Sequence, residues 1–197
     1  MGQRHINQIQ GSMTIERIDE TNVGPITLRK HKYRYQVASR FIEPGDTVVD
    51  AACGSGYGHS LLQCAKYIGI DKDVPEAAKK SGKRYKLHGG YFYKADLCEY
   101  EPDFEYDAFI TLETIEHLQD YTNLVEMAKR AGRVIVVSTP IVPTKHNNPY
   151  HLHDFVKSDI EGLFVDDQWS LAHYETQEGR PGKGMLYGIW VFTRVAS

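Results

Sequence analysis

Three ionisable side chains lie within five consecutive positions of the chain: Glu113, Glu116 and His117. If this segment is helical, the three- and four-residue steps place all three side chains on one face. Two carboxylates and an imidazole on one face can accept a proton near neutral pH. The structural alternative is that Glu113 caps a helix and His117 faces water.

A second group of polar side chains lies in the loop that we expect at residues 141–153, which contains three histidines. Loops that extend from a rigid sheet commonly carry binding groups, although a histidine-rich loop can also be solvated surface. Histidine titrates near neutral pH and therefore suits general-base catalysis. We expect His117 or His151 to act as the base, with Glu116 orienting it.

The stretch at residues 47–58 reads TVVDAACGSGYG, a β-branched run followed by glycine at every second position. A strand, a glycine turn and a helix start together indicate a site for a nucleotide-sized ligand. Gly54 and Gly56 allow the backbone to approach a ligand where a Cβ would collide. The dinucleotide fingerprint needs glycine at its first, third and sixth positions, and the sixth position counted from Gly54 is His59. This spacing disfavours a nicotinamide-dependent oxidoreductase, and a turn without a ligand is the structural alternative.

Two aspartates follow the next predicted strands. Asp71 lies about 20 residues after Asp50, which is the separation expected for an acid that binds ribose hydroxyls. Asp96 follows a third, aromatic strand. Asp71 could instead cap the next helix, and Asp96 could be an ordinary loop residue. Because ligands bind beyond the carboxyl ends of strands in open α/β sheets, we interpret Asp71 as a ribose ligand and leave both alternatives open for Asp96.

These residues need a scaffold in which strand and helix alternate, and the sequence supplies one. The predicted strands span residues 47–50, 67–71, 90–94, 106–112 and 133–138, and the predicted helices span residues 30–41, 58–65, 76–83, 120–131 and 154–164. Two further strands, at 168–174 and 185–195, are joined by a loop that holds no helix. Such a connection predicts an antiparallel hairpin at one sheet edge.

The pattern therefore predicts an α/β fold with a doubly wound, Rossmann-like sheet of seven strands. Five strands are expected to be parallel, and the C-terminal hairpin is expected to be antiparallel. We expect one domain over residues 30–197, preceded by an N-terminal leader, residues 1–29, that is partly disordered. The run of apolar residues at 133–138 is typical of a strand at the centre of a parallel sheet.

The amino-acid composition limits which binding partners and which cellular compartment we expect for this protein. The net charge of −3 at pH 7 gives no basic field that would attract nucleic acid. Cys53, Cys64 and Cys98 are an odd number without metal-ligand spacing, which is typical of reduced cysteines. No apolar run reaches the roughly 18 residues of a membrane-spanning helix, and no signal peptide is visible. We expect a cytoplasmic protein, a monomer or homodimer, that acts on a small molecule and binds neither nucleic acid nor membrane.

The chain carries a series of motifs whose types and order along the sequence resemble those of the class I S-adenosylmethionine (SAM)-dependent methyltransferases. The motifs are Arg34-Tyr35 in the leading helix, DAACGSGYG at 50–58, GID at 69–71, ADL at 95–97, LETIEHL at 112–118, STP at 138–140 and NPYHLHDF at 148–155. The resemblance covers roughly residues 30–194. It is similar in particular to small stand-alone members that are associated with glycan or lipopolysaccharide biosynthesis.

The resemblance implies roles for residues at the nucleoside end of a bound SAM. Asp71 would hold the ribose hydroxyls, and Lys72 would flank the adenine. Asp96 would accept a hydrogen bond from the adenine amino group, while the backbone of Leu97 meets the edge of the ring.

The resemblance also implies roles at the methionine end of SAM. Gly54 and Gly56 would line the methionine part, with Ala52 and Cys53 beside them. Leu112 and Glu113 would close the methionine side, and Arg34 and Tyr35 could reach the carboxylate. One departure from many relatives is Ser55, at a position where they carry an acid.

The ETIEH segment at 113–117 also resembles two metal-assisted groups, the ubiquinone-pathway O-methyltransferases and the small-RNA 3′-terminal 2′-O-methyltransferases. Glu113, Glu116 and His117 would then be candidate ligands for magnesium, with His151 or His153 as the fourth. An imidazole is an unusual ligand for magnesium, however.

Three functions follow as hypotheses. The first is SAM-dependent O-methylation of a small polar or sugar-like acceptor. The second is metal-dependent 2′-O-methylation of RNA, and the third is a SAM-binding module without catalysis. Binding of SAM and not of NAD would separate all three from an oxidoreductase.

Overall fold

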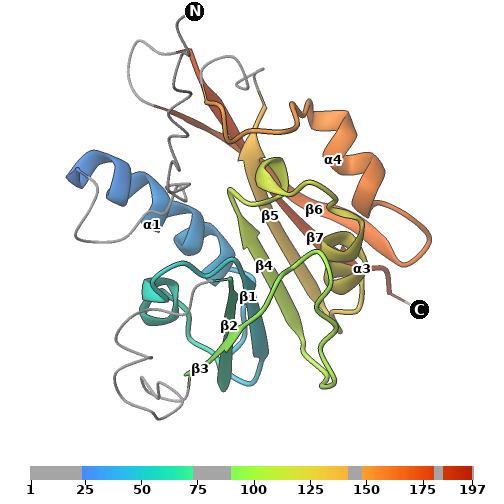
Figure 1. Ribbon diagram of the computed structural model, residues 1–197. Helices are drawn as coiled ribbons and strands as arrows, with labels where there is room; N and C mark the ends of the chain where they lie inside the picture. Colours follow the sequence, from blue (N-terminus) through green and yellow to red (C-terminus); the bar gives the residue numbers. More distant parts are fainter. Residues whose placement is uncertain (1–23, 73–89, 142–147, 180–183, 197) are drawn as a thin grey trace, which may run out of the picture.

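The computed structural model describes residues 24–72, 90–141, 148–179 and 184–196. Its strands are β1 (Thr47–Ala51), β2 (Lys66–Asp71), β3 (Gly90–Lys94), β4 (Ala108–Leu112), β5 (Val134–Pro140), β6 (Trp169–Glu178) and β7 (Leu186–Arg194). They form one seven-stranded sheet in the order β3-β2-β1-β4-β5-β7-β6 (Figure 1). Strands β1 to β5 pair in parallel, whereas β7 is antiparallel to both β5 and β6. This confirms the predicted fold class, including the C-terminal hairpin.

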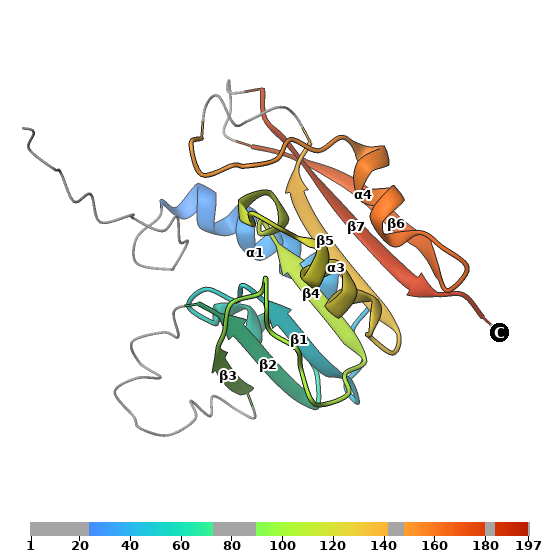
Figure 2. The ribbon, with the colours of Figure 1, turned by 45° about the vertical axis from the view of Figure 1, so that its right-hand side comes forward.

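Helices cover both faces of the sheet. They are α1 (Pro25–Ser39), α3 (Thr122–Lys129) and α4 (Lys157–Phe164), together with the 3₁₀ helices η1 (Tyr57–Leu61) and η2 (Ile115–His117). Helix α1 packs on one face, and α3 and α4 lie on the other (Figure 2). None of the described helices combines the length and the apolar composition that a membrane-crossing helix needs.

The first two predicted helices differ from those that form. Helix α1 begins at Pro25 and not at residue 30, because proline fits the first helical turn, where its missing N–H costs no hydrogen bond. The predicted helix at 58–65 is only the short 3₁₀ helix η1, and Leu62 after it is extended. Its hydrogen bonds span three residues, as in the bond from the His59 N–H to the Gly56 carbonyl. The predicted helix at 76–83 lies outside the described residues.

Hydrogen bonds from backbone N–H groups to aspartate side chains accompany the later starts of the next two helices. The carboxylate of Asp120 accepts the Thr122 N–H at 2.8 Å in a local turn, and α3 begins beyond this aspartate. The carboxylate of Asp159 accepts the Val156 N–H at 2.8 Å, which places the start of α4 at Lys157.

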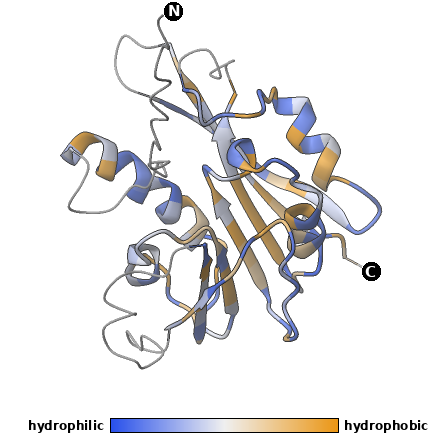
Figure 3. Cartoon of the chain, viewed as in Figure 1, coloured by the Kyte–Doolittle hydropathy of each residue, from blue (hydrophilic) through white to orange (hydrophobic). Residues whose placement is uncertain are grey.

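The core has two layers, one on each side of the sheet. On one side, β-strand residues pack against α3 and α4, and Phe164 of α4 lies with its ring centroid 5.2 Å from that of Phe192. On the other side, Val37 and Ala38 of α1 pack against alternate residues of the same strands. Figure 3 shows that the central strands are apolar and that the loops at their ends are mostly polar. The strand ends are therefore where polar chemistry can concentrate.

One carboxyl group interrupts the apolar core. Asp50 of β1 is completely buried, and its Oδ2 accepts hydrogen bonds from the hydroxyls of Tyr35 at 2.9 Å and Tyr67 at 2.5 Å. These two bonds connect α1, β1 and β2 beneath the glycine loop. Burial raises the pKa of Asp50 to about 7, although the two hydroxyl donors lower it, and the charge of Asp71 raises it further.

The raised pKa predicts a specific pH dependence of folding stability. An acid whose pKa is higher in the folded than in the unfolded protein stabilises the fold at low pH, and this contribution is lost as the pH rises through about 7. The free energy of unfolding of the wild type, relative to Asp50→Asn, should therefore fall by on the order of 2 kcal/mol between pH 5 and pH 8. Urea denaturation at both pH values measures it.

Tyr35→Phe is the matched control for this effect. It removes one donor to the charged carboxylate, so the pH at which stability is lost should move upward. Wild type and Asp50→Asn with parallel stability profiles between pH 5 and pH 8 would contradict the assignment.

Candidate functional site

The turn after β1 has an unusual backbone. Ala52, Gly54 and Gly56 all have positive φ, at 62°, 58° and 79°. Glycine adopts this conformation readily, whereas for Ala52 it is strained. The Gly56 N–H closes the turn on the Cys53 carbonyl at 2.9 Å, and a Cβ at Gly56 would lie 2.4 Å from the ring of Phe92. The sequence therefore needs glycine here for conformation and for space.

Asp71 fastens this glycine turn to β2. Its Oδ2 accepts the Gly54 N–H at 2.9 Å, and the Cys53 N–H donates to the Ile70 carbonyl at 3.1 Å. The carboxylate stands at the end of β2 and is only partly buried. The structure thus brings together the loop and the acid that the sequence nominated separately.

The predicted nucleoside-binding residues lie at adjacent strand ends. The ammonium of Lys72 lies 3.0 Å from the carboxylate of Asp96, and both side chains are exposed to solvent. The Cys98 N–H, together with this ammonium, lowers the pKa of Asp96. Leu97 is buried against the core and only 4 % exposed. Asp71, the last residue of β2, is in register with Lys94, the last residue of β3. The residues that follow these two strands therefore emerge at the same end of the sheet.

Arg34 of α1 is a buried cation at the other end of the glycine turn. Its guanidinium lies 3.8 Å from the carboxylate of Glu113 and 4.2 Å above the ring of Tyr187. The hydroxyl of Ser138 also donates to Glu113, at 2.9 Å. Arg34 is 3 % exposed, and its Nε has no hydrogen-bond partner within the part of the chain that the structure describes. A buried guanidinium with a spare donor suits recognition of a carboxylate.

Tyr35 and Leu112 are less suited than Arg34 to bind a ligand carboxylate. The hydroxyl of Tyr35 donates to Asp50, so this hydrogen is already used. A Cβ at Gly58 would lie 2.3 Å from the Tyr35 ring, which shows how closely α1 packs on the glycine turn. Leu112 is the last residue of β4 and is buried. Of the two residues predicted to reach a carboxylate, Arg34 is the better placed.

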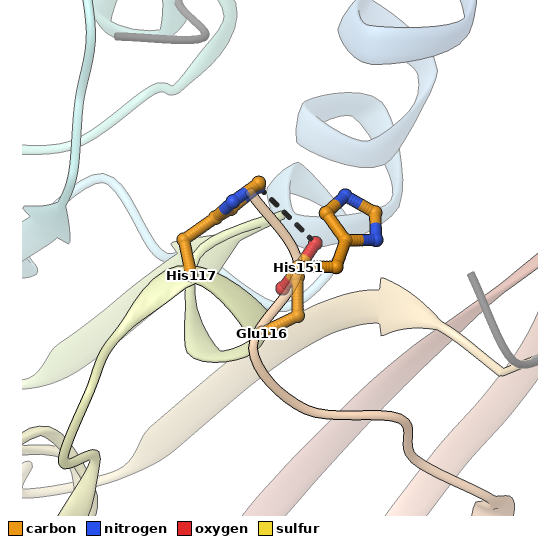
Figure 4. Close-up of side chains that lie close together, drawn as sticks. All are labelled: Glu116, His117 and His151. Carbon is orange, nitrogen blue, oxygen red and sulfur yellow. Dashed lines mark ion pairs between the residues drawn. The ribbon is translucent and has the colours of Figure 1, made fainter. Parts of the chain in front are cut away.

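A carboxylate and two imidazoles meet beyond the ends of β4 and β5. Glu116, His117 and His151 each offer a ligand atom, and these atoms lie within 4.8 Å of one another (Figure 4). The two histidine rings are edge to face, with centroids 4.7 Å apart. His153, the other histidine nominated beside them, instead has its Nε2 2.8 Å from the Leu118 carbonyl. The structure thus assembles all three residues that we predicted as catalytic.

Neighbouring strands and loops hold this cluster in place. Thr139 of β5 donates its hydroxyl to Glu116 Oε2 at 2.9 Å. The Leu152 N–H donates to the backbone carbonyl of Glu116 at 2.7 Å and fastens the His151 loop to η2. Burial raises the pKa of the Glu116 carboxyl well above its ordinary value, and the negative charge of Glu113 raises it further.

One geometric expectation was wrong. The helix η2 spans only Ile115–His117, and Glu113 precedes it with a positive φ of 54°. Glu113 therefore does not share a helical face with Glu116, and its carboxylate pairs with Arg34. The tertiary ion pair overrides the helical spacing that the sequence pattern suggested.

Sequence reasoning assigned no role to three supporting residues. Tyr67, which binds Asp50, looked like an ordinary strand residue, and Tyr187 lies far from Arg34 in the sequence. Thr139 belongs to the STP motif near the end of β5, so its place at the edge where ligands bind could have indicated its role.

Comparisons with known proteins identify similarities to methyltransferases. Residues 49–134 match the family described as "Methyltransferase domain". A probable SAM-dependent methyltransferase from Mycobacterium tuberculosis is 28% identical over 170 residues, which cover 80% of this chain and 60% of the relative. A probable SAM-dependent methyltransferase from Mycolicibacterium smegmatis is 29% identical over 185 residues, covering 84% of this chain and 68% of the relative. The chain thus spans about three fifths of the length of the M. tuberculosis relative.

A solved structure shares the fold. The magnesium protoporphyrin IX methyltransferase from Synechocystis PCC 6803 with bound SAH (S-adenosylhomocysteine) superposes with a TM-score of 0.67 at 19% identity, over 90% of each chain. This structural similarity concerns the fold alone, whereas the family match and the two relatives are similarities in sequence to methyltransferases.

Proposed function

We propose that this chain catalyses methyl transfer from SAM to a hydroxyl of a small polar or sugar-like acceptor. The observation that carries the proposal is the position of the Glu116–His117–His151 cluster. It lies at the same carboxyl edge of the sheet as the glycine turn. Glu113 connects the cluster to Arg34, through its ion pair with Arg34 and the effect of its charge on Glu116. We infer that a site for a ligand with a ribose and a carboxylate adjoins a site that can accept a proton.

The residues present fit SAM. The left-handed turn at Gly54 and Gly56 leaves no side chain between the loop backbone and a ligand. Asp71 offers a partly exposed carboxylate for ribose hydroxyls. Arg34 has a buried Nε without a partner among the described residues, which suits the SAM carboxylate. Asp96 and Leu97 are proposed to meet the adenine at the end of β3.

SAM, when bound, supplies a methyl group on a positively charged sulfur that is ready for displacement. The chain's own task is to position the acceptor and exclude water. Buried residues on both faces of the strand ends, such as Leu112 and Ile115, limit access of water to this edge.

The acceptor hydroxyl must lose its proton during transfer. His117 or His151 is proposed to receive it, with Glu116 fixing the position of the imidazole. His117 is the more accessible of the two, at 27% exposure, and its Nε2 is 3.8 Å from the Glu116 carboxylate. General-base assistance of this kind contributes about 10²–10⁴-fold to a rate.

Asp71→Ala tests the cofactor site. Loss of the carboxylate removes the proposed ribose contact and frees the Gly54 N–H, so the dissociation constant for SAH should rise at least about tenfold, as expected for a lost charged hydrogen bond. Calorimetric titration measures it. Asp166→Ala is the matched control, because it removes an aspartate that pairs with Lys129 away from the strand ends. Equal SAH affinity in Asp71→Ala and wild type would contradict the assignment.

His117→Ala and His151→Ala test the acceptor site. Each should lower kcat at a saturating acceptor, by about 10²–10⁴-fold for the histidine that acts as the base, while SAH affinity stays within about twofold. Transfer of a labelled methyl group from SAM into a fractionated metabolite extract provides the assay and identifies the acceptor. His173→Ala is the control, since His173 pairs with Glu175 on β6 and lies outside the cluster.

The same assay separates the other two functions. Label transferred to RNA and not to small molecules would favour RNA methylation, and SAH binding without transfer to any pool would favour a binding module. Unchanged turnover in both histidine variants would remove the proposed role of the cluster.

A further inference from the structure

The carboxylate of Glu116 presents an unsatisfied oxygen to the cluster. Its Oε1 is buried and has no hydrogen-bond partner among the residues that the structure describes, and the side chain is only 1% exposed. Nε2 of His117 is 3.8 Å from this oxygen, which is longer than a hydrogen bond. Figure 4 shows this carboxylate directed between the two imidazole rings. An unpaired carboxylate oxygen at such a depth is costly.

The hydrogen bonding of His117 determines which of its nitrogens faces the carboxylate. Its Nδ1 lies 3.0 Å from the carbonyl oxygen of Tyr150. A carbonyl only accepts, so Nδ1 carries the hydrogen, and in the neutral ring Nε2 carries the lone pair. This lone pair and Oε1 of Glu116 therefore face the same positive centre, which is either a shared proton or a metal ion.

His151 supplies a third ligand atom from another part of the chain. It is 8% exposed, and its ligand atom lies within 4.8 Å of those of Glu116 and His117. The bond from the Leu152 N–H to the Glu116 carbonyl holds the His151 loop against η2. Two segments that are distant in sequence, η2 and the loop that contains His151, therefore position the three side chains.

We propose that Glu116, His117 and His151 bind one divalent first-row transition-metal ion, such as Zn²⁺, Mn²⁺ or Co²⁺. Two imidazole nitrogens and one carboxylate oxygen suit such ions, whereas Mg²⁺ takes oxygen ligands. Metal–ligand bonds of about 2.1 Å place ligands of a tetrahedral ion about 3.4 Å apart, so the pair at 3.8 Å needs to close only slightly. Glu113 is not part of the set, because Arg34 and Ser138 hold its carboxylate.

The surroundings of the ligands match those of known metal sites. A metal-bound histidine generally donates its second N–H to a carbonyl or carboxylate, as His117 does to Tyr150. A metal-bound carboxylate is generally hydrogen-bonded on its other oxygen, as Glu116 is by Thr139. Both supporting contacts therefore exist before an ion arrives.

The consequence of this site for the reaction rests on the proposed function. An ion held by both imidazoles would take over the general-base role proposed above for His117 or His151. It would lower the pKa of the acceptor hydroxyl, whose O–H bond would break with the proton passing to solvent water.

Metal binding is measured on the full chain without an added histidine tag, after chelator treatment and in the absence of SAM and acceptor. Co²⁺ is titrated with visible absorption as the readout, and Zn²⁺, Mn²⁺ and Mg²⁺ are titrated by calorimetry. We expect about one ion per chain, with Zn²⁺ and Co²⁺ bound at least about tenfold more tightly than Mg²⁺. Absence of stoichiometric binding by any of the transition-metal ions would overturn the proposal.

Variants locate the ion. His117→Ala and His151→Ala should weaken Co²⁺ binding at least about tenfold, and Glu116→Gln should do the same without changing side-chain volume. His173→Ala is the control, because it removes a histidine from another histidine–carboxylate pair, 2.9 Å apart, and should leave binding unchanged. His117 is partly exposed, so its variant tests the site even if Glu116→Gln fails to fold.

Equal Co²⁺ binding in His117→Ala and wild type would also overturn the proposal. SAH titration on the same samples separates the two proposals. SAH binding without metal binding overturns only the metal site, and metal binding without SAH binding overturns only the proposed function.

Discussion

Parallel pairing of β1 with both β2 and β4 is the constraint on which the whole site depends. Ala51 is in register with Ile70 on one side and with Thr111 on the other. Parallel strands end at the same edge of a sheet, so the glycine turn, Asp71 and the segment after β4 must emerge together. The pairing of β4 with β5 extends this edge to Ser138, which holds Glu113. Short loops then suffice to bring distant residues into contact.

The same edge concentrates buried polar groups that a stable fold would otherwise avoid. Arg34, Asp50 and Glu116 are each at most 3% exposed, and each has a polar atom without a hydrogen-bond partner among the described residues. Such an atom costs about 1–3 kcal/mol. Their burial comes from the packing of α1 on one side and of the His151 loop on the other. We interpret these groups as places where the fold gives up stability for ligand binding.

The sequence was sufficient to predict the sheet, because its central strands are apolar or β-branched runs bounded by turn residues. It was also sufficient to nominate Asp71, Glu116 and His151, because ligands bind at strand ends. Local spacing was insufficient where tertiary contacts decide the conformation. Glu113 leaves the helical pattern with a positive φ and pairs with Arg34, whose stacking partner is distant in sequence. Periodicity carries no information about such contacts.

The account holds that one pocket at these strand ends receives the adenosyl and methionine parts of SAM together. A crystal structure of the chain with SAH tests this most directly. We predict that the ribose hydroxyls contact Asp71 and that the SAH carboxylate contacts Arg34, with the glycine turn against the sulfur end. SAH bound at any other edge or face of the sheet would contradict the account.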